Sequence, residues 1–404
     1  MKIKNIFSFL YILLCCAMLA IGRVFDARLD VFGINLSVLI STAYFGISFL
    51  LLITIKDVVF SKSKYLLYGF YFLVLLVTPL LWLIYGLPEI VGIAPGLDRY
   101  ISFSLIVIPI SVILIEKARY QDISRLFFVL FILTVALSVL AIFGLSVTEN
   151  LNGRLSVLGG GPIIFARWLG FGIIYLVIFP IGLKWLKIPL ILLFISLMFA
   201  TGSRGPVLSI VITFSVYFLM NFNKLFFKTI LIVGVSFFII FSFNINKKLS
   251  ELGNIDRIFM NFSSQGVKKK STNARVVFNQ RSFELIKEYP LGVGVGNWQK
   301  MINKQNPRHL IKHEYPHNIF LEIAAEYGLI SVFLFILIII NTIYLGIKNI
   351  KIANSIFSLY QLFFYLFLFY LINSMVSGMI IDSRILFIVS GLILCSKELN
   401  YSHE

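Results

Sequence analysis

The chain has 404 residues, of which 59% are hydrophobic and 13% are charged, and its mean hydropathy is +0.96. Soluble globular domains carry about twice this share of charged residues, so the composition excludes that class and indicates a membrane protein. The formal net charge of +17 at pH 7 does not favour nucleic-acid binding, because the lysines fall in alternate loops rather than along one stripe.

Apolar stretches of membrane-spanning length recur along the whole chain. A helix needs about 20 apolar residues to cross a hydrocarbon core of roughly 30 Å, whereas barrel strands would be half as long and would alternate in polarity. We therefore predict an all-α polytopic membrane protein with about twelve transmembrane helices. The predicted spans lie near residues 5–22, 34–55, 65–85, 100–116, 124–145, 162–182, 186–201, 205–221, 225–243, 327–347, 356–378 and 383–396.

The first apolar stretch follows Lys2 and Lys4, as the apolar segment of a cleaved signal peptide would. Further spans follow it immediately, so we favour an uncleaved first span. With the N-terminus in the cytoplasm, every cytoplasmic loop carries lysine, as the positive-inside rule requires. We expect both termini in the cytoplasm, a membrane bundle over 1–243, an extracytoplasmic loop and catalytic region over 244–326, and three further helices with a cytoplasmic tail over 327–404.

The short loops on the outer side contain almost no lysine. Their basic residues are arginines: Arg23, Arg28, Arg99, Arg154, Arg204 and Arg384. A guanidinium group suits phosphate and carboxylate ligands because its donors form a planar fork. An arginine can also reach for lipid head groups, and we adopt that interpretation for Arg23, Arg28 and Arg154.

Arg204 has a different setting, in the sequence A-T-G-S-R-G-P. The apolar stretches on either side, Ile188–Ala200 and Pro206–Met220, span only about 20 Å as helices, so the turn is expected to dip below the membrane surface. An arginine at that depth is costly and is a functional candidate by default. Gly202 and Gly205 permit a tight turn there.

The long polar loop contains two recognisable segments. The sequence A-R-V-V-F-N-Q-R-S-F-E-L-I-K-E predicts an amphipathic helix that begins at Arg275 and has Phe278, Leu285 and Ile286 on one side. The following L-G-V-G-V-G-N-W has G-x-G-x-G spacing but no preceding strand, which makes it a weak nucleotide-binding motif.

Three of the four histidines, His309, His313 and His317, are spaced four residues apart. On one helix they would share a face, as zinc ligands often do. Pro316 disfavours helical geometry at the residue before it, and neither Cys nor Asp stands nearby to complete a ligand set. We therefore expect neither a metal nor a cofactor, and we interpret His309 and His313 as loop residues.

His317 stands immediately before a predicted helix that continues into the tenth span. Asn318 can cap this helix, and Glu322 and Glu326 fall in its first two turns. His317 is thus expected at the outer mouth of a helix bundle. Histidine is the side chain best suited to accept a proton near neutral pH, so His317 is a candidate general base.

Four segments resemble the O-antigen ligase and O-antigen polymerase superfamily of bacterial envelope glycosyltransferases. They are T-G-S-R-G-P at 201–206, A-R-V-V-F at 274–278, Y-P-L-G-V-G-V-G-N-W at 289–298 and P-H-N-I-F-L-E-I-A-A-E-Y-G at 316–328. The resemblance covers about a third of the chain, and the layout of many spans with one large outer loop also fits it. The P-H-N segment with its E-x-G ending is the most specific of the four.

The resemblance implies a metal-independent enzyme in the bacterial inner membrane that transfers glycan from undecaprenyl diphosphate to an acceptor hydroxyl, with inversion at the anomeric carbon. It assigns Arg204 and Arg275 to the diphosphate and makes His317 the catalytic histidine. Some members carry a second histidine where this chain has Tyr315, which leaves His313 as a possible assistant. The substrate-binding candidates are Arg384, Arg281, His313, Asn318 and Glu326.

The resemblance leaves the acceptor open. A polymerase extends a lipid-linked glycan and can work with a chain-length regulator protein, whereas a ligase transfers finished polymer to the lipid A core. We favour the O-antigen or capsular repeat-unit polymerase, because the T-G-S-R-G-P and P-H-N-I-F-L-E segments resemble those of polymerases more closely. The alternative from another class is a flippase or transporter for lipid-linked sugar, although the chain shows no internal repeat of the kind that transporters carry.

Overall fold

The structure is a computed structural model. The residues it describes are 2–26, 29–31, 34–55, 62–88, 95–144, 147–150, 154–158, 160–179, 184–220, 269–302, 314–352, 359–377 and 379–395. The predicted ninth span over 225–243, together with His309 and His313, lies outside these ranges. The predicted boundary between residues 243 and 244 lies outside them as well, so the three-part division of the chain stays a prediction.

The chain forms two compact units, the first made of Met1–Leu130 and Lys269–Glu404 and the second of Phe131–Lys268. Helix α6 belongs to both, because the division falls in its middle. The described helices of the first unit are α1 (Lys2–Ile21), α2 (Leu36–Ile53), α3 (Lys62–Tyr85), α4 (Pro95–Ser102), the π-helical turn η2 (Phe103–Val107), α5 (Ile108–Glu116), the start of α6 (Tyr120–Ile142), α13 (Lys269–Glu288), α14 (Asn297–Ile302), α15 (Ile319–Tyr327), α16 (Leu329–Ile352), α17 (Leu359–Val376), the 3₁₀ turn η4 (Ile380–Ser383) and α18 (Arg384–Leu394).

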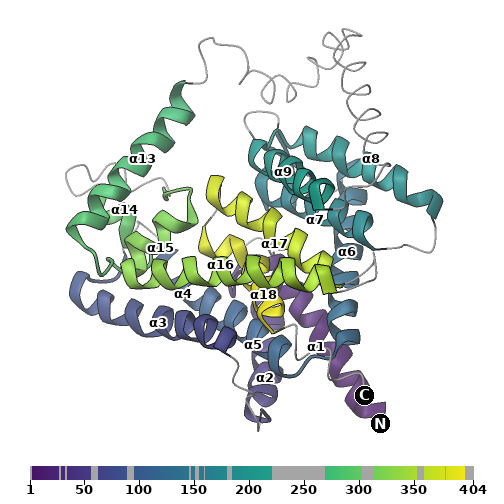
Figure 1. Ribbon diagram of the computed structural model, residues 1–404, viewed down its shortest axis with the longest axis horizontal. Helices are drawn as coiled ribbons and strands as arrows, with labels where there is room; N and C mark the ends of the chain where they lie inside the picture. The colour runs from purple at the N-terminus through teal and green to yellow at the C-terminus, as the bar shows by residue number, and fades with distance from the viewer. Residues whose placement is uncertain are drawn as a thin grey trace. The chain divides into compact units, whose positions relative to one another are not determined.

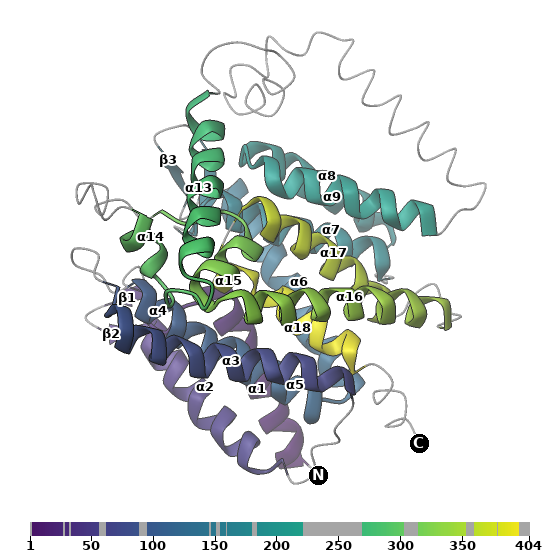
Figure 2. The ribbon, with the colours of Figure 1, turned by 60° about the vertical axis from the view of Figure 1, so that its left-hand side comes forward.

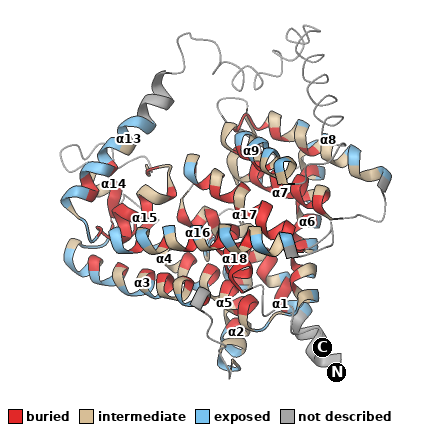
Figure 3. Cartoon of the chain, in the orientation of Figure 1, coloured by how far each residue is buried: buried red, intermediate tan, exposed pale blue. Residues whose placement is uncertain are grey.

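Helix α18 lies in the core of the first unit, packed against α17, α16 and α5 (Figure 1). All of its residues after Arg384 are buried, as expected for a helix that is apolar on every side (Figure 3). The ring of Phe387 lies 5.1 to 5.8 Å from those of Phe103, Phe335 and Phe70. These aromatic contacts join α18 to α3, η2 and α16, which also places α3 alongside α16 (Figure 2).

The second unit contains the end of α6, α7 (Pro162–Ile178), α8 (Lys184–Ala200), α9 (Arg204–Met220) and an antiparallel hairpin of β3 (Val147–Asn150) and β4 (Arg154–Val157). Helix α7 is buried along almost its whole length. Tyr175 stacks on Phe131 with ring centroids 4.7 Å apart. A Cβ on Gly172 would come within 2.6 Å of the Phe194 ring, so this glycine lets α7 and α8 approach closely.

Six described helices are long and apolar enough to cross a membrane. They lie at Leu36–Ile53, Lys64–Tyr85, Gly96–Glu116, Tyr120–Ile142, Leu329–Lys351 and Leu359–Val376. Four shorter apolar helices lie at Phe9–Ile21, Pro162–Ile178, Trp185–Ala200 and Arg204–Met220. The fold is therefore mostly helical and consistent with a polytopic membrane protein, while the total of twelve spans stays a prediction.

Two local predictions were wrong. The all-α expectation missed two short hairpins, the one formed by β3 and β4 and another formed by β1 (Asp30–Val31) and β2 (Ile34–Asn35). The predicted helix after His317 also does not continue into the tenth span, because it ends at Gly328, where φ is +88°. A Cβ there would lie 2.5 Å from the carbonyl oxygen of Leu291, so both the backbone angle and the space require glycine.

Candidate functional site

His317 has a left-handed backbone conformation, with φ at +59°. This is uncommon for a residue other than glycine and costs about 1–3 kcal/mol, and such strain is concentrated at active sites. His317 lies where the chain turns from the irregular segment 314–316 into α15. The side chain of Asn318 caps that helix as predicted, because its Oδ1 accepts hydrogen bonds from the N–H groups of Phe320 and Leu321 at 2.9 and 3.3 Å.

An aromatic wall, made of Tyr315, Phe278 and Trp298, stands beside the His317 ring. The Tyr315 and His317 centroids are 3.9 Å apart, and Phe278 lies nearly parallel to His317 at 6.3 Å. Trp298 meets Phe278 edge to face at 5.6 Å and donates from Nε1 to Ser282 Oγ at 2.9 Å. The histidine ring is therefore packed against two rings, and Trp298 supports one of them, which restricts the orientation of His317.

Helix α13 supplies part of this wall and confirms the predicted amphipathic helix, which begins at Lys269 rather than at the predicted Arg275. Leu285 and Ile286 are buried, and Phe278 packs against the same apolar cluster. Arg275 is exposed one turn before Phe278, so the two side chains are neighbours on the helix surface. Arg275 Nη1 donates to the carbonyl oxygen of Val376 at 3.1 Å. Arg281 is also exposed, one turn beyond Phe278.

The glycine-punctuated loop after α13 pairs with the chain around the end of α15. Val293 N–H donates to Ala325 O at 3.0 Å, and Gly294 N–H donates to Glu326 O at 2.9 Å. A Cβ on Gly296 would lie 2.6 Å from the Gly96 Cα, so the loop approaches the start of α4 at backbone distance. The glycines therefore serve close backbone packing, which accounts for their spacing without a nucleotide.

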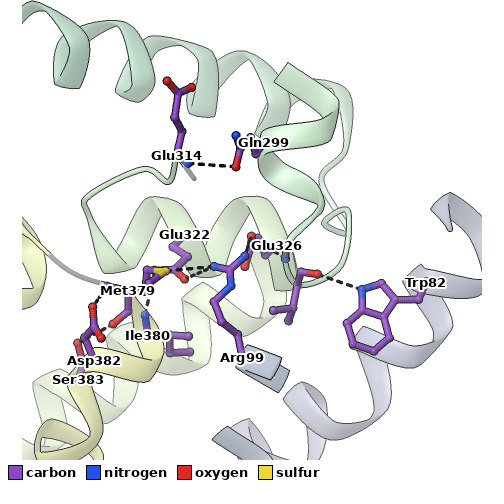
Figure 4. A network of polar contacts seen from close by, with 12 residues as sticks. Trp82, Arg99, Gln299, Glu314, Glu322, Glu326, Met379, Ile380, Asp382 and Ser383 are labelled. Atoms are coloured by element: carbon purple, nitrogen blue, oxygen red, sulfur yellow. Dashed lines mark hydrogen bonds and ion pairs between the residues drawn. The ribbon is translucent and has the colours of Figure 1, made fainter. Parts of the chain in front are cut away.

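Arg99 forms a buried network with the two glutamates of α15 (Figure 4). Its Nη1 lies 3.2 Å from Glu322 Oε1, and its Nη2 lies 3.1 Å from Glu326 Oε1. Gly296 N–H donates to Glu326 Oε1 at 2.9 Å, and Ile380 N–H donates to Glu322 Oε2 at 3.0 Å. The network thus joins α4, α15, the glycine loop and η4.

Burial disfavours the ionised form of both carboxyl groups in this network. It raises the pKa of Glu322 well above its usual range, with the neighbouring Glu326 acting in the same direction and Arg99 opposing both. Burial also raises the pKa of Glu326, against the opposing effects of Arg99 and the Gly296 N–H. One guanidinium therefore faces two carboxyl groups whose pKa values are both raised by burial.

Arg384 begins α18, and its guanidinium reaches the end of α1. Its Nη1 donates to the carbonyl oxygen of Gly22 at 3.1 Å. A Cβ on Gly22 would collide with that guanidinium, and φ at Gly22 is +73°. This contact ties α18 to α1, and the predicted substrate-binding role of Arg384 stays a prediction.

Arg204 belongs to the second unit, where it begins α9 directly after a tight turn. Gly202 in this turn has φ at +60°, and Thr201 and Ser203 are buried. Helices α8 and α9 have 17 residues each, or about 26 Å of helix, which is short for a membrane span. These features agree with the turn predicted from the short apolar stretches.

A second arginine supports this turn. Arg154 Nε donates to the carbonyl oxygen of Thr201 at 3.0 Å, and its Nη2 donates to Ser203 Oγ at 2.9 Å. The expectation that Arg154 reaches for lipid head groups was therefore wrong, since its donors bind the turn that precedes Arg204. Arg167 is a further arginine of this unit, and it is buried in α7.

The first unit brings part of the predicted site together. His317, Asn318 and Arg275 lie around α15 and α13, with Arg275 connected to His317 through Phe278. Glu326 is buried in the Arg99 network, and His313 lies outside the described residues. Within the described ranges, no group of three or more His, Cys, Asp or Glu side chains could hold a metal ion.

Sequence reasoning missed Arg99 and Arg154 as supporting residues. A signal for Arg99 was present, because Glu322 and Glu326 are spaced four apart on an otherwise apolar segment. Two carboxylates on one face of a buried helix require a cation opposite them, and Arg99 was among the outer arginines. No comparable signal identified Arg154, since its partners are a backbone carbonyl and a hydroxyl.

Part of the chain matches a known family. The sequence model of the family described as O-antigen ligase matches residues 189–336, and over this stretch the chain is similar to that family. A search of curated proteins found no match to the chain.

The O-antigen ligase match supports the resemblance found from the four motifs, and its range includes Arg204, Arg275 and His317. Arg384 lies beyond it. Similarity to the O-antigen ligase family favours an enzyme of glycan transfer that uses lipid-linked glycan. Together with the apolar helices it indicates a multi-pass protein of the inner membrane.

Proposed function

We propose that the protein transfers glycan from undecaprenyl diphosphate to a sugar hydroxyl on the outer side of the cytoplasmic membrane, without a metal ion. The observation that carries this proposal is the setting of His317, whose strained backbone and aromatic wall hold a proton acceptor against Phe278, one helical turn from the exposed Arg275. The match to the O-antigen ligase family over the same residues favours a transferase over a transporter.

In the proposed step, the acceptor hydroxyl oxygen attacks the anomeric carbon of the donor glycan. The bond between that carbon and the diphosphate oxygen breaks, and its electron pair leaves with the diphosphate. His317 takes the hydroxyl proton, which makes the oxygen a competent nucleophile. Attack opposite the leaving group inverts the anomeric carbon.

The arginines act on the leaving group. Guanidinium groups stabilise the charge that develops on the diphosphate as the bond breaks, and this stabilisation is largest where water is excluded. We assign this role to Arg204 and Arg275, and we assign Arg281, Arg384 and Asn318 to substrate binding. A diphosphate paired in this way leaves without help from a general acid.

Among enzymes of this chemistry, we propose a repeat-unit polymerase, because the motifs around Arg204 and His317 favour that class. The second candidate is an O-antigen ligase, which the description of the matching family favours. Gene deletion separates the two. Loss of a polymerase leaves a single repeat unit on the lipid A core, whereas loss of a ligase leaves bare core and accumulates lipid-linked polymer.

The transfer itself can be tested in liposomes that contain the full-length protein and lipid-linked repeat units from the host strain. We expect longer glycan chains and release of undecaprenyl diphosphate, both unaffected by a strong chelator. Activity that disappears with the chelator and returns with a divalent metal would contradict the metal-free mechanism. Movement of intact donor across the bilayer without bond cleavage would support a flippase instead.

A further inference from the structure

The Arg99 network buries three ionisable side chains at one point of the first unit (Figure 4). The exposed fractions of the Arg99, Glu322 and Glu326 side chains are 8%, 0% and 1%. Removing such groups from water costs several kcal/mol per charge, and apolar residues of similar size are often equally stabilising. A gain in folding stability therefore does not explain why these three residues are charged. The geometry that they fix is the better explanation for their presence.

The network reaches the surroundings of His317 by two routes. The first runs along α15, because Glu322 stands in the first turn of the helix that Asn318 caps directly after His317. The second runs through Glu326 and the Gly296 N–H to the glycine loop. Two residues later in that loop, Trp298 packs against Phe278 of the aromatic wall. Both the backbone of His317 and the Phe278 ring that packs against His317 are thus connected to the Arg99 guanidinium.

A third arm of the network holds η4. Glu322 Oε2 accepts the Ile380 N–H at 3.0 Å, and Arg99 Nη1 also lies 3.7 Å from the sulfur of Met379. Asp382 Oδ2 accepts the Met379 N–H at 3.2 Å and closes the turn. This turn follows the end of α17, whose Val376 carbonyl accepts from Arg275. The network therefore also restrains the segment that Arg275 contacts.

We propose that Arg99 is a positioning residue for the transfer reaction, which fixes His317 and the aromatic wall through Glu322 and Glu326. This inference rests on the proposed role of His317 as the base. Arg99 is buried away from solvent and acts through α15 and the glycine loop rather than by contact with substrate. Its planar fork suits the task, because one guanidinium holds two carboxylates four residues apart on one helix.

Displacement of a catalytic group by about 1 Å can lower a rate about 100-fold. We therefore expect Arg99→Met to lower kcat about 100-fold while KM for the lipid-linked donor changes less than about threefold. Arg99→Lys keeps the charge but loses the fork, and we expect kcat about 10-fold below the native value. Glu322→Gln keeps one acceptor oxygen in place of the two that bind Arg99 and the Ile380 N–H, so we expect it to lower kcat by less than about 10-fold.

A loss of kcat in Arg99→Met could also follow from an unpaired buried carboxylate that destabilises the fold. The triple variant Arg99→Met, Glu322→Leu, Glu326→Met removes all three charges and is expected to keep native thermal stability. We expect its kcat to stay low even so. The matched control is Arg23→Met, because Arg23 is exposed, pairs with Asp98 next to Arg99, and is expected to leave kcat unchanged.

The assay uses full-length protein in liposomes with the lipid-linked glycan extracted from host cells, and His317→Ala is measured in parallel. If His317→Ala keeps the native rate, the proposed function is wrong. If His317→Ala is inactive but the stable triple variant keeps kcat within about threefold of native, the function stands and the positioning role of Arg99 is overturned. If the triple variant does not accumulate, the same criterion is applied to Arg99→Lys. A kcat within about threefold of native in that variant overturns the positioning role of Arg99.

Discussion

Two arginines support the two candidate regions in different ways. Arg154, in the second unit, donates to a carbonyl and a hydroxyl oxygen of the turn before Arg204. Arg99, in the first unit, donates to two carboxylates of the helix that follows His317. The first set of bonds joins a cation to neutral oxygens, whereas the second balances charge within the protein. We propose from this difference that the Arg204 turn receives an anion and that the His317 region holds a base in place.

The largest effect expected from this comparison is at His317. His317→Ala should lower the transfer rate at least about 100-fold, because general base catalysis contributes about 10² to 10⁴. The protein should remain inserted and abundant, which immunoblots of membrane fractions can check. A native rate in this variant would remove His317 from the mechanism.

The next largest effect is expected at Arg204. Arg204→Lys should lower transfer about 10- to 100-fold, since a lysine cannot reproduce two charge-assisted bonds from a planar fork. KM for the lipid-linked donor should rise in this variant, in contrast to Arg99→Met. Full activity with lysine at this position would show that the diphosphate assignment is wrong.

A smaller effect is expected at Arg154, because it acts only by holding the turn. Loss of one hydrogen bond costs about 1 kcal/mol, so Arg154→Lys should raise KM about 3- to 10-fold. Ser203→Ala removes one acceptor of Arg154, and its effect should not add to that of Arg154→Lys. Additive effects in the double variant would show that the turn is held by other contacts.

The smallest effect concerns thermal stability rather than rate. Because burial raises the pKa of Glu322 above its unfolded value, its protonated form favours the folded state, and that stability is lost as the pH rises through the folded pKa. The groups facing it are Arg99, Glu326 and Asp382. We expect the melting temperature of purified native protein to fall more than that of Glu322→Gln as the pH rises above about 4.3, the ordinary pKa of a glutamate. An equal fall in both would contradict a raised pKa at Glu322.

Local features of the fold could be predicted from the sequence. The amphipathic helix of α13, the Asn318 cap and the tight turn at Gly202 depend on residues within a few positions of one another. Their signals are periodicity, capping chemistry and glycine, all of which can be read from short stretches. The same stretches did not reveal the break at Gly328, because it depends on the approach of Leu291.

The supporting residues could not be predicted in the same way. Arg99 and Glu322 are separated by 223 positions, and no local pattern determines which outer arginine lies against α15. Arg154 and Ser203 are 49 positions apart, and the hydrogen bond joins a guanidinium to an uncharged hydroxyl, so no second charge marks the partner in the sequence. Tertiary packing selects these partners, and the sequence shows only that buried carboxylates need a cation.

The central claim is that the Arg204 turn binds the anion while the His317 region moves the proton. The most direct test measures the binding of undecaprenyl diphosphate to native protein, His317→Ala and Arg204→Lys in nanodiscs. If the Arg204 turn binds the anion and His317 moves the proton, His317→Ala should bind within about twofold of native, and Arg204→Lys should bind about 10-fold or more weakly. Native binding by Arg204→Lys together with lost binding by His317→Ala would contradict the account.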